Sequence, residues 1–293
     1  MIRISHFISG GIILISGFIL SATAVESPDR NCSMNKDIVR FGIFADAQYA
    51  DIPDKGKRQY RESLWKIDSC IAEFNESDLD FAVNLGDLVD RCPESLDTVN
   101  AHLSKAGMPL YHVLGNHDVS TMPPAMFLKK LRQKDRYYSF TAGNWGFIVL
   151  DTNEKPRGKA DRELARKRYS GVAGPRQMRW LEKTLDNLEK SGLNVIIFSH
   201  QPIFPSTGIN AVNDIQLLEL FRSRPCIKAV FAGHHHRGGF GHDGSVPYII
   251  HTGMVESGDD NSYSIVTLAD DRIIIEGFGT AMSATAATNG ERE

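Results

Sequence analysis

Five short apolar segments recur along the chain, and each ends in a carboxylate, amide or imidazole side chain. Each segment has the length and apolar content of a buried β-strand, and each polar group follows a glycine or another small residue. In α/β proteins, ligand sites are built at the carboxyl ends of strands because rigid strands hold the loop residues in place. Core packing does not explain such a repeated pattern. The polar residues at these strand ends are Asp46 with Gln48, Asp87, Asn116 with His117, His200, and His234 with His236.

The segments between these strands include two with helical periodicity. Gly174-Pro175 precedes one of them, and proline suits the first turn of a helix. The apolar stripes of the two helices are Tyr60, Leu64, Ile67, Ile71 and Phe74, and Met178, Leu181, Leu185 and Leu188. The strands are expected at residues 38–45, 81–85, 110–114, 195–198 and 227–231, with a hairpin at 137–150 and short strands near Tyr248, Ile265 and Ile274. No repeat or long linker divides the chain, so the pattern predicts one α/β domain whose C-terminal part is rich in antiparallel strands.

The composition is that of an ordinary globular protein. The 293 residues are 42% hydrophobic and 24% charged, with a formal net charge of −3. These values argue against disorder, collagen-like repeats and coiled coils. They also argue against a nucleic-acid partner, which needs a basic surface to displace counterions from phosphates.

The N-terminus has the pattern of a secretory signal peptide. Arg3 precedes an apolar run at residues 7–20, and Ala22-Thr23-Ala24 fits the small-residue cleavage site. The run is shorter than the ~18 residues expected of a spanning helix. An uncleaved anchor and a buried strand are the alternatives. We expect a signal peptide at 1–24, a linker at 25–37, a domain at 38–280 and a flexible tail at 281–293, in an exported (periplasmic or secreted) protein without a membrane anchor after cleavage.

Four cysteines leave two interpretations open. Export permits disulfides, and four cysteines allow three complete pairings that the sequence does not rank. Four separate buried thiols are the alternative. No C-x-x-C spacing is present, so a cysteine-based zinc site is not expected. The cysteines are Cys32, Cys70, Cys92 and Cys226.

The polar strand ends also carry sequence motifs. They read DAQ at residues 46–48, GD at 86–87, GNHD at 115–118, SH at 199–200 and GHHH at 233–236. In this order and spacing they resemble the calcineurin-like metallophosphoesterases. The resemblance implies a single-domain, four-layer α/β/β/α sandwich, in which two β-sheets are flanked by helices and a two-metal site lies at one edge.

The resemblance also implies two sets of metal ligands. Asp87 belongs to both sets, because two closely spaced cations need an anion between them. A water that bridges the cations would lose a proton and attack phosphorus. The two sets are Asp46, Gln48, Asp87 and His236, and Asp87, Asn116, His200 and His234.

A catalytic role falls on the histidine of the GNHD motif. In the family this residue, here His117, contacts the substrate phosphate and protonates the leaving oxygen, beside Asn116. Asp118 would orient its imidazole. We therefore expect His117 and Asp118 to be the catalytic pair.

Gln48 departs from the usual family motif, D-x-H. An amide oxygen in place of an imidazole nitrogen makes the site harder, which favours Mn²⁺ or Mg²⁺. We expect two divalent cations, Mn²⁺ first, with Mg²⁺, Fe and Zn as alternatives. Purple acid phosphatases carry a tyrosine ligand three residues after the second motif aspartate, and Asp90 stands there in this chain.

Longer stretches resemble the manganese-dependent ADP-ribose/CDP-alcohol diphosphatases. They are DAQYAD at residues 46–51, GPRQMRWLEKTL at 174–185 and FAGHHHRGG at 231–239. The resemblance implies that the substrate is a nucleoside diphosphate conjugate, such as ADP-ribose or a CDP-alcohol, split at its pyrophosphate bond into two phosphomonoesters. The loop at 52–57 is shorter than in the animal members, so base preference does not carry over. Tyr49 either lines the pocket or packs beneath it, and Arg58 either contacts phosphate or is solvated.

Two other functions remain as alternatives at this point. One is a phosphodiesterase or phosphomonoesterase with a different substrate, since the same two-metal chemistry serves both. The other is a non-catalytic scaffold, which the complete ligand set counts against. The sequence does not specify the oligomeric state.

Overall fold

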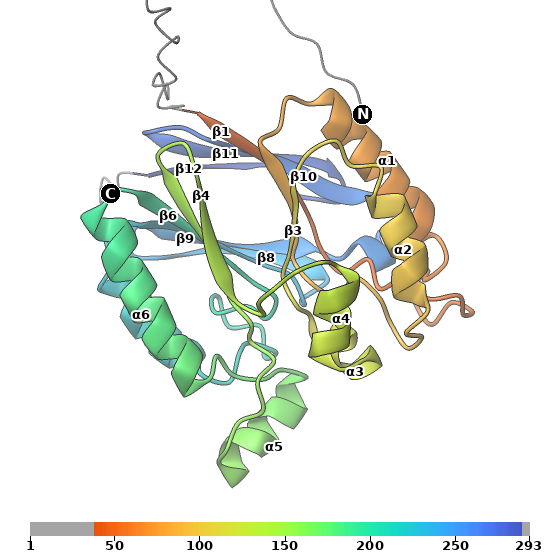
Figure 1. Ribbon diagram of the computed structural model, residues 1–293, viewed down its shortest axis with the longest axis horizontal. Helices are drawn as coiled ribbons and strands as arrows, with labels where there is room; N and C mark the ends of the chain where they lie inside the picture. Colours follow the sequence, from red (N-terminus) through yellow and green to blue (C-terminus); the bar gives the residue numbers. More distant parts are fainter. Residues whose placement is uncertain (1–37, 289–293) are drawn as a thin grey trace, which may run out of the picture. The chain divides into compact units, whose positions relative to one another are not determined.

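The computed structural model describes residues 38–288. The expected signal peptide (1–24) and linker (25–37) therefore lie outside the described residues, as do Cys32 and residues 289–293. Within the described part, the apolar segments expected as strands form strands, and they pair into two six-stranded sheets (Figure 1).

The first sheet begins and ends with short edge strands. Its order is β12 (Ala284–Ala287), β11 (Arg272–Gly279), β10 (Ser262–Leu268), β1 (Val39–Phe44), β2 (Phe81–Asn84) and β3 (Leu110–His112). Strands β1, β2 and β3 are parallel, whereas β10, β11 and β12 are antiparallel to their neighbours. The carboxyl ends of the three parallel strands consequently meet at one edge of this sheet.

The second sheet repeats the arrangement with a parallel centre. Its order is β4 (Tyr138–Ala142), β5 (Trp145–Val149), β6 (Asn194–Ser199), β7 (Ile227–Ala232), β9 (Val246–Thr252) and β8 (Arg237–Asp243). Strands β5, β6, β7 and β9 are parallel, and β4 and β8 close the sheet as antiparallel edges. The expected hairpin is β4 and β5, which turns at Gly143.

The two sheets pack face to face through an aromatic core. Phe41 of β1 stacks on Phe81 of β2 at 5.1 Å between ring centroids and meets Phe147, Phe198 and Phe231 of the second sheet edge-on. These rings are nearly inaccessible to solvent. Burial of aromatic rings is a large contribution to folding, and their offset and edge-on geometries add to it.

Helices cover the outer faces of both sheets. Apolar faces of α1 (Ser63–Glu76), α2 (Ser95–Leu103) and α4 (Pro124–Lys130) pack on the first sheet. Those of α6 (Pro175–Lys190) and α7 (Asp214–Arg222) pack on the second. The order of layers is helix, sheet, sheet, helix, which confirms the predicted sandwich. The remaining short elements are α3 (Asn116–Thr121), α5 (Lys159–Arg168) and the 3₁₀ turn η1 (Met254–Glu256).

Three sequence expectations need correction or completion. Strand β12 lies inside the segment expected to be a flexible tail from residue 281, because its small residues still pair in register with β11. Strand β8 was not predicted, since its three glycines lower its β-propensity. The described cysteines, Cys70, Cys92 and Cys226, are free thiols.

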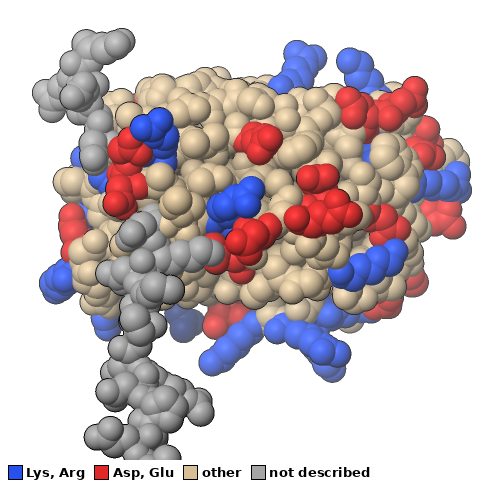
Figure 2. All heavy atoms as spheres, turned by 90° about the horizontal axis from the view of Figure 1, so that it is seen from above, with Lys and Arg blue, Asp and Glu red and all other residues tan. Residues whose placement is uncertain are grey.

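The surface of the described residues is mixed in charge. On the face shown in Figure 2, Lys and Arg side chains lie among Asp and Glu side chains. Between residues 38 and 288, no helix combines the length and the apolar character needed to cross a membrane.

Candidate active site

The predicted ligand residues lie where the strands of both sheets end. Asp46 and Gln48 follow β1, Asp87 follows β2, and Asn116 begins α3 after β3. Backbone hydrogen bonds join the first two loops, from Asp46 N to Gly86 O at 3.0 Å and from Gln48 N to Asp87 O at 2.8 Å. The second sheet contributes His200 after β6, His234 after β7 and His236 before β8.

Four of these residues have left-handed backbone conformations. Their φ angles are 54° at Asp46, 44° at Gln48, 52° at Asp87 and 67° at His234. Such conformations cost on the order of 1–3 kcal/mol each in a residue with a side chain and persist only where the surroundings enforce them. Gly115 leaves room for Asp87, because a Cβ there would overlap the backbone nitrogen and carboxylate of Asp87. These four residues thus have strained backbones, and their side chains point toward the site at the strand ends.

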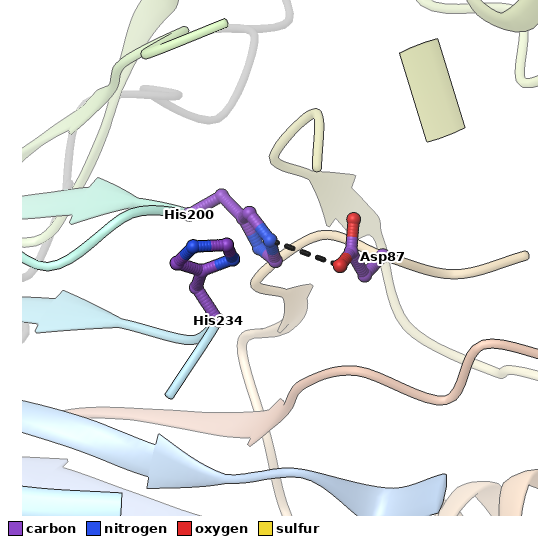
Figure 3. A group of neighbouring side chains, drawn as sticks. All are labelled: Asp87, His200 and His234. Carbon is purple, nitrogen blue, oxygen red and sulfur yellow. Dashed lines mark ion pairs between the residues drawn. The ribbon is translucent and has the colours of Figure 1, made fainter. Parts of the chain in front are cut away.

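One group of donor atoms converges on Asp87. The ligand atoms of Asp87, His200 and His234 lie within 4.8 Å of one another, and all three residues are buried (Figure 3). His200 Nε2 lies 3.2 Å from Asp87 Oδ2 and 3.1 Å from Asn116 Oδ1. Two imidazoles, a carboxylate and an amide oxygen around one point form a metal-binding site.

A second group of donor atoms shares the same carboxylate. His236 Nε2 lies 3.3 Å from Asp46 Oδ1, and the Gln48 side-chain amide lies 3.2 Å from Asp87 Oδ2 and 3.1 Å from His236 Nε2. Asp46 Oδ1 and Gln48 Oε1 are buried and have no hydrogen-bond partner among the described residues. A half-turn of the Gln48 amide would point its oxygen at the same position, the orientation that a cation selects. The unsatisfied Asp46 Oδ1 and the reoriented Gln48 oxygen would fit a divalent cation here.

The histidine rings are oriented as metal ligands are. In each ring one nitrogen is hydrogen-bonded to a backbone carbonyl or a carboxylate, which leaves the other nitrogen to face the centre of the site. The outer bonds are His200 Nδ1 to Leu85 O at 2.8 Å, His234 Nε2 to Arg168 O at 3.2 Å, and His236 Nδ1 to Glu256 Oε1 at 2.9 Å.

A carboxylate also orients the ring of His117, but it belongs to Asp90 and not to Asp118 as expected. His117 Nδ1 lies 2.9 Å from Asp90 Oδ1, and its Nε2 faces the site, 3.9 Å from Asp87 Oδ2. Burial lowers the pKa of His117, but the hydrogen bond to Asp90 and the negative charges of Asp87 and Asp90 together outweigh it, so the net shift is upward. An imidazole that retains its proton and faces the site is suited to be a general acid.

The prediction that Asp118 orients His117 is therefore wrong. Asp118 lies in the first turn of α3, and its side chain points back toward the loop after β2. Its Oδ1 accepts hydrogen bonds from the backbone nitrogens of Leu88 and Val89, and its Oδ2 accepts one from Gly115 N. Asp118 thus fixes the loops that carry Asp87 and Asn116. The sequence signal for Asp90 is its position three residues after Asp87, where purple acid phosphatases carry a tyrosine ligand.

The family model for calcineurin-like phosphoesterases matches residues 39–238, a span that includes every ligand described above. The chain belongs to this family. It is a metal-dependent phosphoester hydrolase, and Asp87, His200 and His234 form a group in it that could hold a metal ion.

Comparisons with individual proteins agree with this assignment. A manganese-dependent ADP-ribose/CDP-alcohol diphosphatase from Oryza sativa is 27% identical over 266 residues, which cover 74% of this phosphoesterase and 83% of that protein. The protein of the same name from Homo sapiens is 24% identical over 322 residues, which cover 86% and 94%. Among solved structures, a dimetal phosphatase from Danio rerio matches with a TM-score of 0.77 at 24% identity, covering 86% of this chain and 99% of that one. That structural likeness concerns the fold.

A cavity of about 450 Å³ opens over the phosphoesterase site. Arg58 lines it, together with Lys55 and Arg91. Tyr49 does not line it. This residue is 8% exposed and packs in the core between the first sheet and its helices, so its expected substrate contact is a misassignment.

Arg58 is held by a carboxylate that also holds a metal ligand. Its Nε lies 3.2 Å from Glu256 Oε1, the same oxygen that His236 contacts. The hydrogen bond from His236 lowers the pKa of Glu256 to about 2 despite partial burial. The loop that carries Glu256 is fixed by the buried Lys66 ammonium, which donates to Met254 O, Ser257 Oγ and Gly258 O. Glu256 thus ties an arginine of the cavity to the metal site, and no motif marked it in the sequence.

Proposed function

We propose that this phosphoesterase hydrolyses the pyrophosphate bond of nucleoside diphosphate conjugates, such as ADP-ribose and CDP-alcohols, with two bound Mn²⁺ ions. The observation that carries the proposal is the sharing of Asp87 by two groups of donor atoms. His200 Nε2 and Gln48 Nε2 both lie 3.2 Å from Asp87 Oδ2, and the two residues belong to separate groups of donor atoms. Two cations on one carboxylate are suited to in-line displacement at phosphorus.

The oxygen-rich donor set supports manganese. Asp46, Gln48, Asp87 and Asn116 offer carboxylate and amide oxygens, and hard divalent cations prefer such ligands. The names of the relatives from Oryza sativa and Homo sapiens indicate the same metal. When bound, the cations would acidify a water and stabilise charge on the phosphoryl oxygens.

The protein's own residues would do the remaining work. Arg58, Lys55 and Arg91 place three cationic side chains around the cavity, which suits it to an anionic phosphate substrate. His117, with Nδ1 bonded to Asp90, would give the proton on Nε2 to the departing oxygen. The partner is therefore a nucleotide-type small molecule.

The experiment is a substrate comparison with the mature protein and Mn²⁺. ADP-ribose should yield AMP, and CDP-glycerol should yield CMP, each with one further phosphomonoester. Turnover of bis-p-nitrophenyl phosphate or cyclic nucleotides without turnover of either conjugate would refute the pyrophosphatase assignment. Asp87→Asn, assayed in parallel, excludes a contaminating hydrolase.

We also propose that the protein is exported, on the evidence of the N-terminal sequence alone. The apolar run and the Ala22-Thr23-Ala24 site support cleavage before Val25. N-terminal sequencing of the protein from the extracytoplasmic fraction should begin at Val25. Recovery of the intact N-terminus from the cytoplasm would contradict this proposal.

A further inference from the structure

A second cavity adjoins the catalytic one. It has a volume of about 630 Å³, and Asn116, His117 and Tyr169 line both cavities. Its outer wall is α5 and the chain that leads into it, while α3 forms its inner side. Figure 1 shows α5 at the same edge of the sandwich as α3.

The wall of this second cavity is basic. Lys155, Arg162 and Arg166 line it, and among the described residues no carboxylate lies within ion-pair distance of any of them. The acidic residue in the lining, Glu154, is occupied, because its Oε1 accepts hydrogen bonds from Gly174 N and Gln177 Nε2. The cavity therefore presents an uncompensated positive charge to an anionic ligand.

The basic residues of helix α5 differ in their partners. Two of the basic residues outside the cavity are paired, Lys167 with Glu163 at 3.2 Å and Arg168 with Asp214 at 3.0 Å, whereas Arg162 and Arg166, which line the cavity, have no ion pair among the described residues. The helix buries no residue, so core packing does not account for its position. Its last carbonyl, Arg168 O, accepts the hydrogen bond from His234 Nε2. This contact fixes the end of the basic wall against the metal site.

The position of His117 defines which part of a substrate the second cavity faces. In-line displacement places the attacking and leaving oxygens on opposite sides of phosphorus. A general acid must lie within hydrogen-bond reach of the leaving oxygen. Because His117 lines both cavities, a leaving oxygen within its reach lies where the first cavity adjoins the second.

We propose that the second cavity is the subsite for the departing phosphomonoester half of the substrate, held by Arg162, Arg166 and Lys155. The inference rests on the proposed function. Hydrolysis joins the oxygen of one water to the attacked phosphorus and breaks its bond to the bridging oxygen. The bonding pair stays on the bridging oxygen, which takes the proton from His117, and the water's protons pass to His117 and to solvent. The departing half is a phosphate monoester, whose negative charge the basic wall complements.

The test compares two double variants of α5. Arg162→Ala/Arg166→Ala removes two charges from the cavity wall, and Lys159→Ala/Lys167→Ala removes two charges from the same helix outside the cavity. The measured quantity is kcat/KM for ADP-ribose or CDP-glycerol divided by kcat/KM for bis-p-nitrophenyl phosphate, whose leaving group carries no phosphate. We expect the arginine variant to lower this ratio about tenfold, mainly through KM for the conjugate, and the lysine variant to leave it unchanged.

A second measurement identifies the half that binds there. Hydrolysis in water labelled with heavy oxygen marks the product that was attacked, so the unlabelled product is the half that departed. In the arginine variant the inhibition constant of the unlabelled product should rise about tenfold, with a smaller change for the labelled product. An equal ratio in the two double variants, or a rise confined to the labelled product, would overturn the proposal. If wild type hydrolyses bis-p-nitrophenyl phosphate but neither conjugate, the proposed function fails, and this inference fails with it.

Discussion

The two β-sheets bring chemically different donors to the same edge of the sandwich. The loops after β1, β2 and β3 of the first sheet supply the oxygen donors, and the loops at β6, β7 and β8 of the second supply the nitrogen donors. The oxygen donors are Asp46, Gln48, Asp87 and Asn116, and the nitrogen donors are His200, His234 and His236.

The charged donors of the site therefore come from one sheet and its neutral imidazoles from the other. The first sheet carries both carboxylates, which attract a cation over a long range, whereas the imidazoles of the second sheet bind as neutral groups. Neither sheet alone offers a complete site. The aromatic core between the sheets therefore sets the geometry of the chemistry as well as the stability of the fold.

Asp87→Asn should have the largest effect, because it removes the charge that both donor groups share. We expect kcat to fall by more than ~10³-fold with loss of bound Mn²⁺, measured by elemental analysis of the purified protein. His200→Asn, which removes one neutral ligand from the second sheet, should cost less. If His200→Asn were the more damaging variant, charge would not be what distinguishes the first sheet.

His117→Ala tests a first-sheet residue that supplies no metal donor. Loss of general acid catalysis should lower kcat by ~10²–10⁴-fold, while the Mn²⁺ content stays at the wild-type level. Single-turnover kinetics with metal analysis of the same sample would check this. A wild-type rate would remove His117 from the mechanism.

Asp90→Asn should have a smaller effect through the orientation of His117. Loss of the carboxylate that holds Nδ1 should lower kcat by ~10–10²-fold at unchanged metal content. Asp118→Asn is the contrasting variant, since Asp118 contacts backbone nitrogens and should affect thermal stability more than kcat. Equal losses of kcat and of melting temperature in both variants would refute the distinction.

The sequence was sufficient to predict the layers and the convergence of the donor residues. Each donor follows a buried strand at a motif position, so strand ends and motif order predicted their convergence without distances. The residues that hydrogen-bond to these side chains were harder to predict, because the direction of each side chain depends on the local turn of the backbone. Asp118 is the sequence neighbour of His117, yet the first turn of α3 points it the other way, and Asp90 reaches the ring from a different loop.

The positions of three other features could not be predicted from periodicity or motifs in the sequence. Helix α5 has no buried face, and Glu256 is a single acidic residue in a turn. Tyr49 lies within a motif but faces the core. Such placements depend on packing between distant segments, which local patterns do not encode.

Removal of metal should destabilise the fold because the ligands come from both sheets. With free Mn²⁺ at about 100 times its dissociation constant, binding would contribute about 2.7 kcal/mol to the free energy of unfolding. A chelator should therefore lower the wild-type melting temperature. Asp87→Asn should be insensitive to the chelator, and an equal response in that variant would mean that the metal does not link the sheets.

The smallest predicted effect concerns a buried histidine of the first sheet. Burial lowers the pKa of His112 to about 4, so between pH 6.5 and 4 the unfolded chain binds a proton that the folded protein does not. The free energy of unfolding should therefore decrease as the pH is lowered through this window, and at pH 5 it should be about 2 kcal/mol below its value at neutral pH. Urea unfolding of wild type and His112→Leu at pH 7 and pH 5 would check this. A loss of the same size in the leucine variant would exclude His112 as the cause.

The left-handed backbone at four metal ligands has a consequence for engineering. Glycine is the residue best suited to the conformations of Asp46, Gln48, Asp87 and His234, and it offers no donor atom. Selection for heat resistance alone would accordingly favour glycine at the positions where catalysis needs a carboxylate, an amide or an imidazole. A stabilisation campaign on this enzyme should hold these four codons fixed and seek its gains in the helices and loops far from this edge.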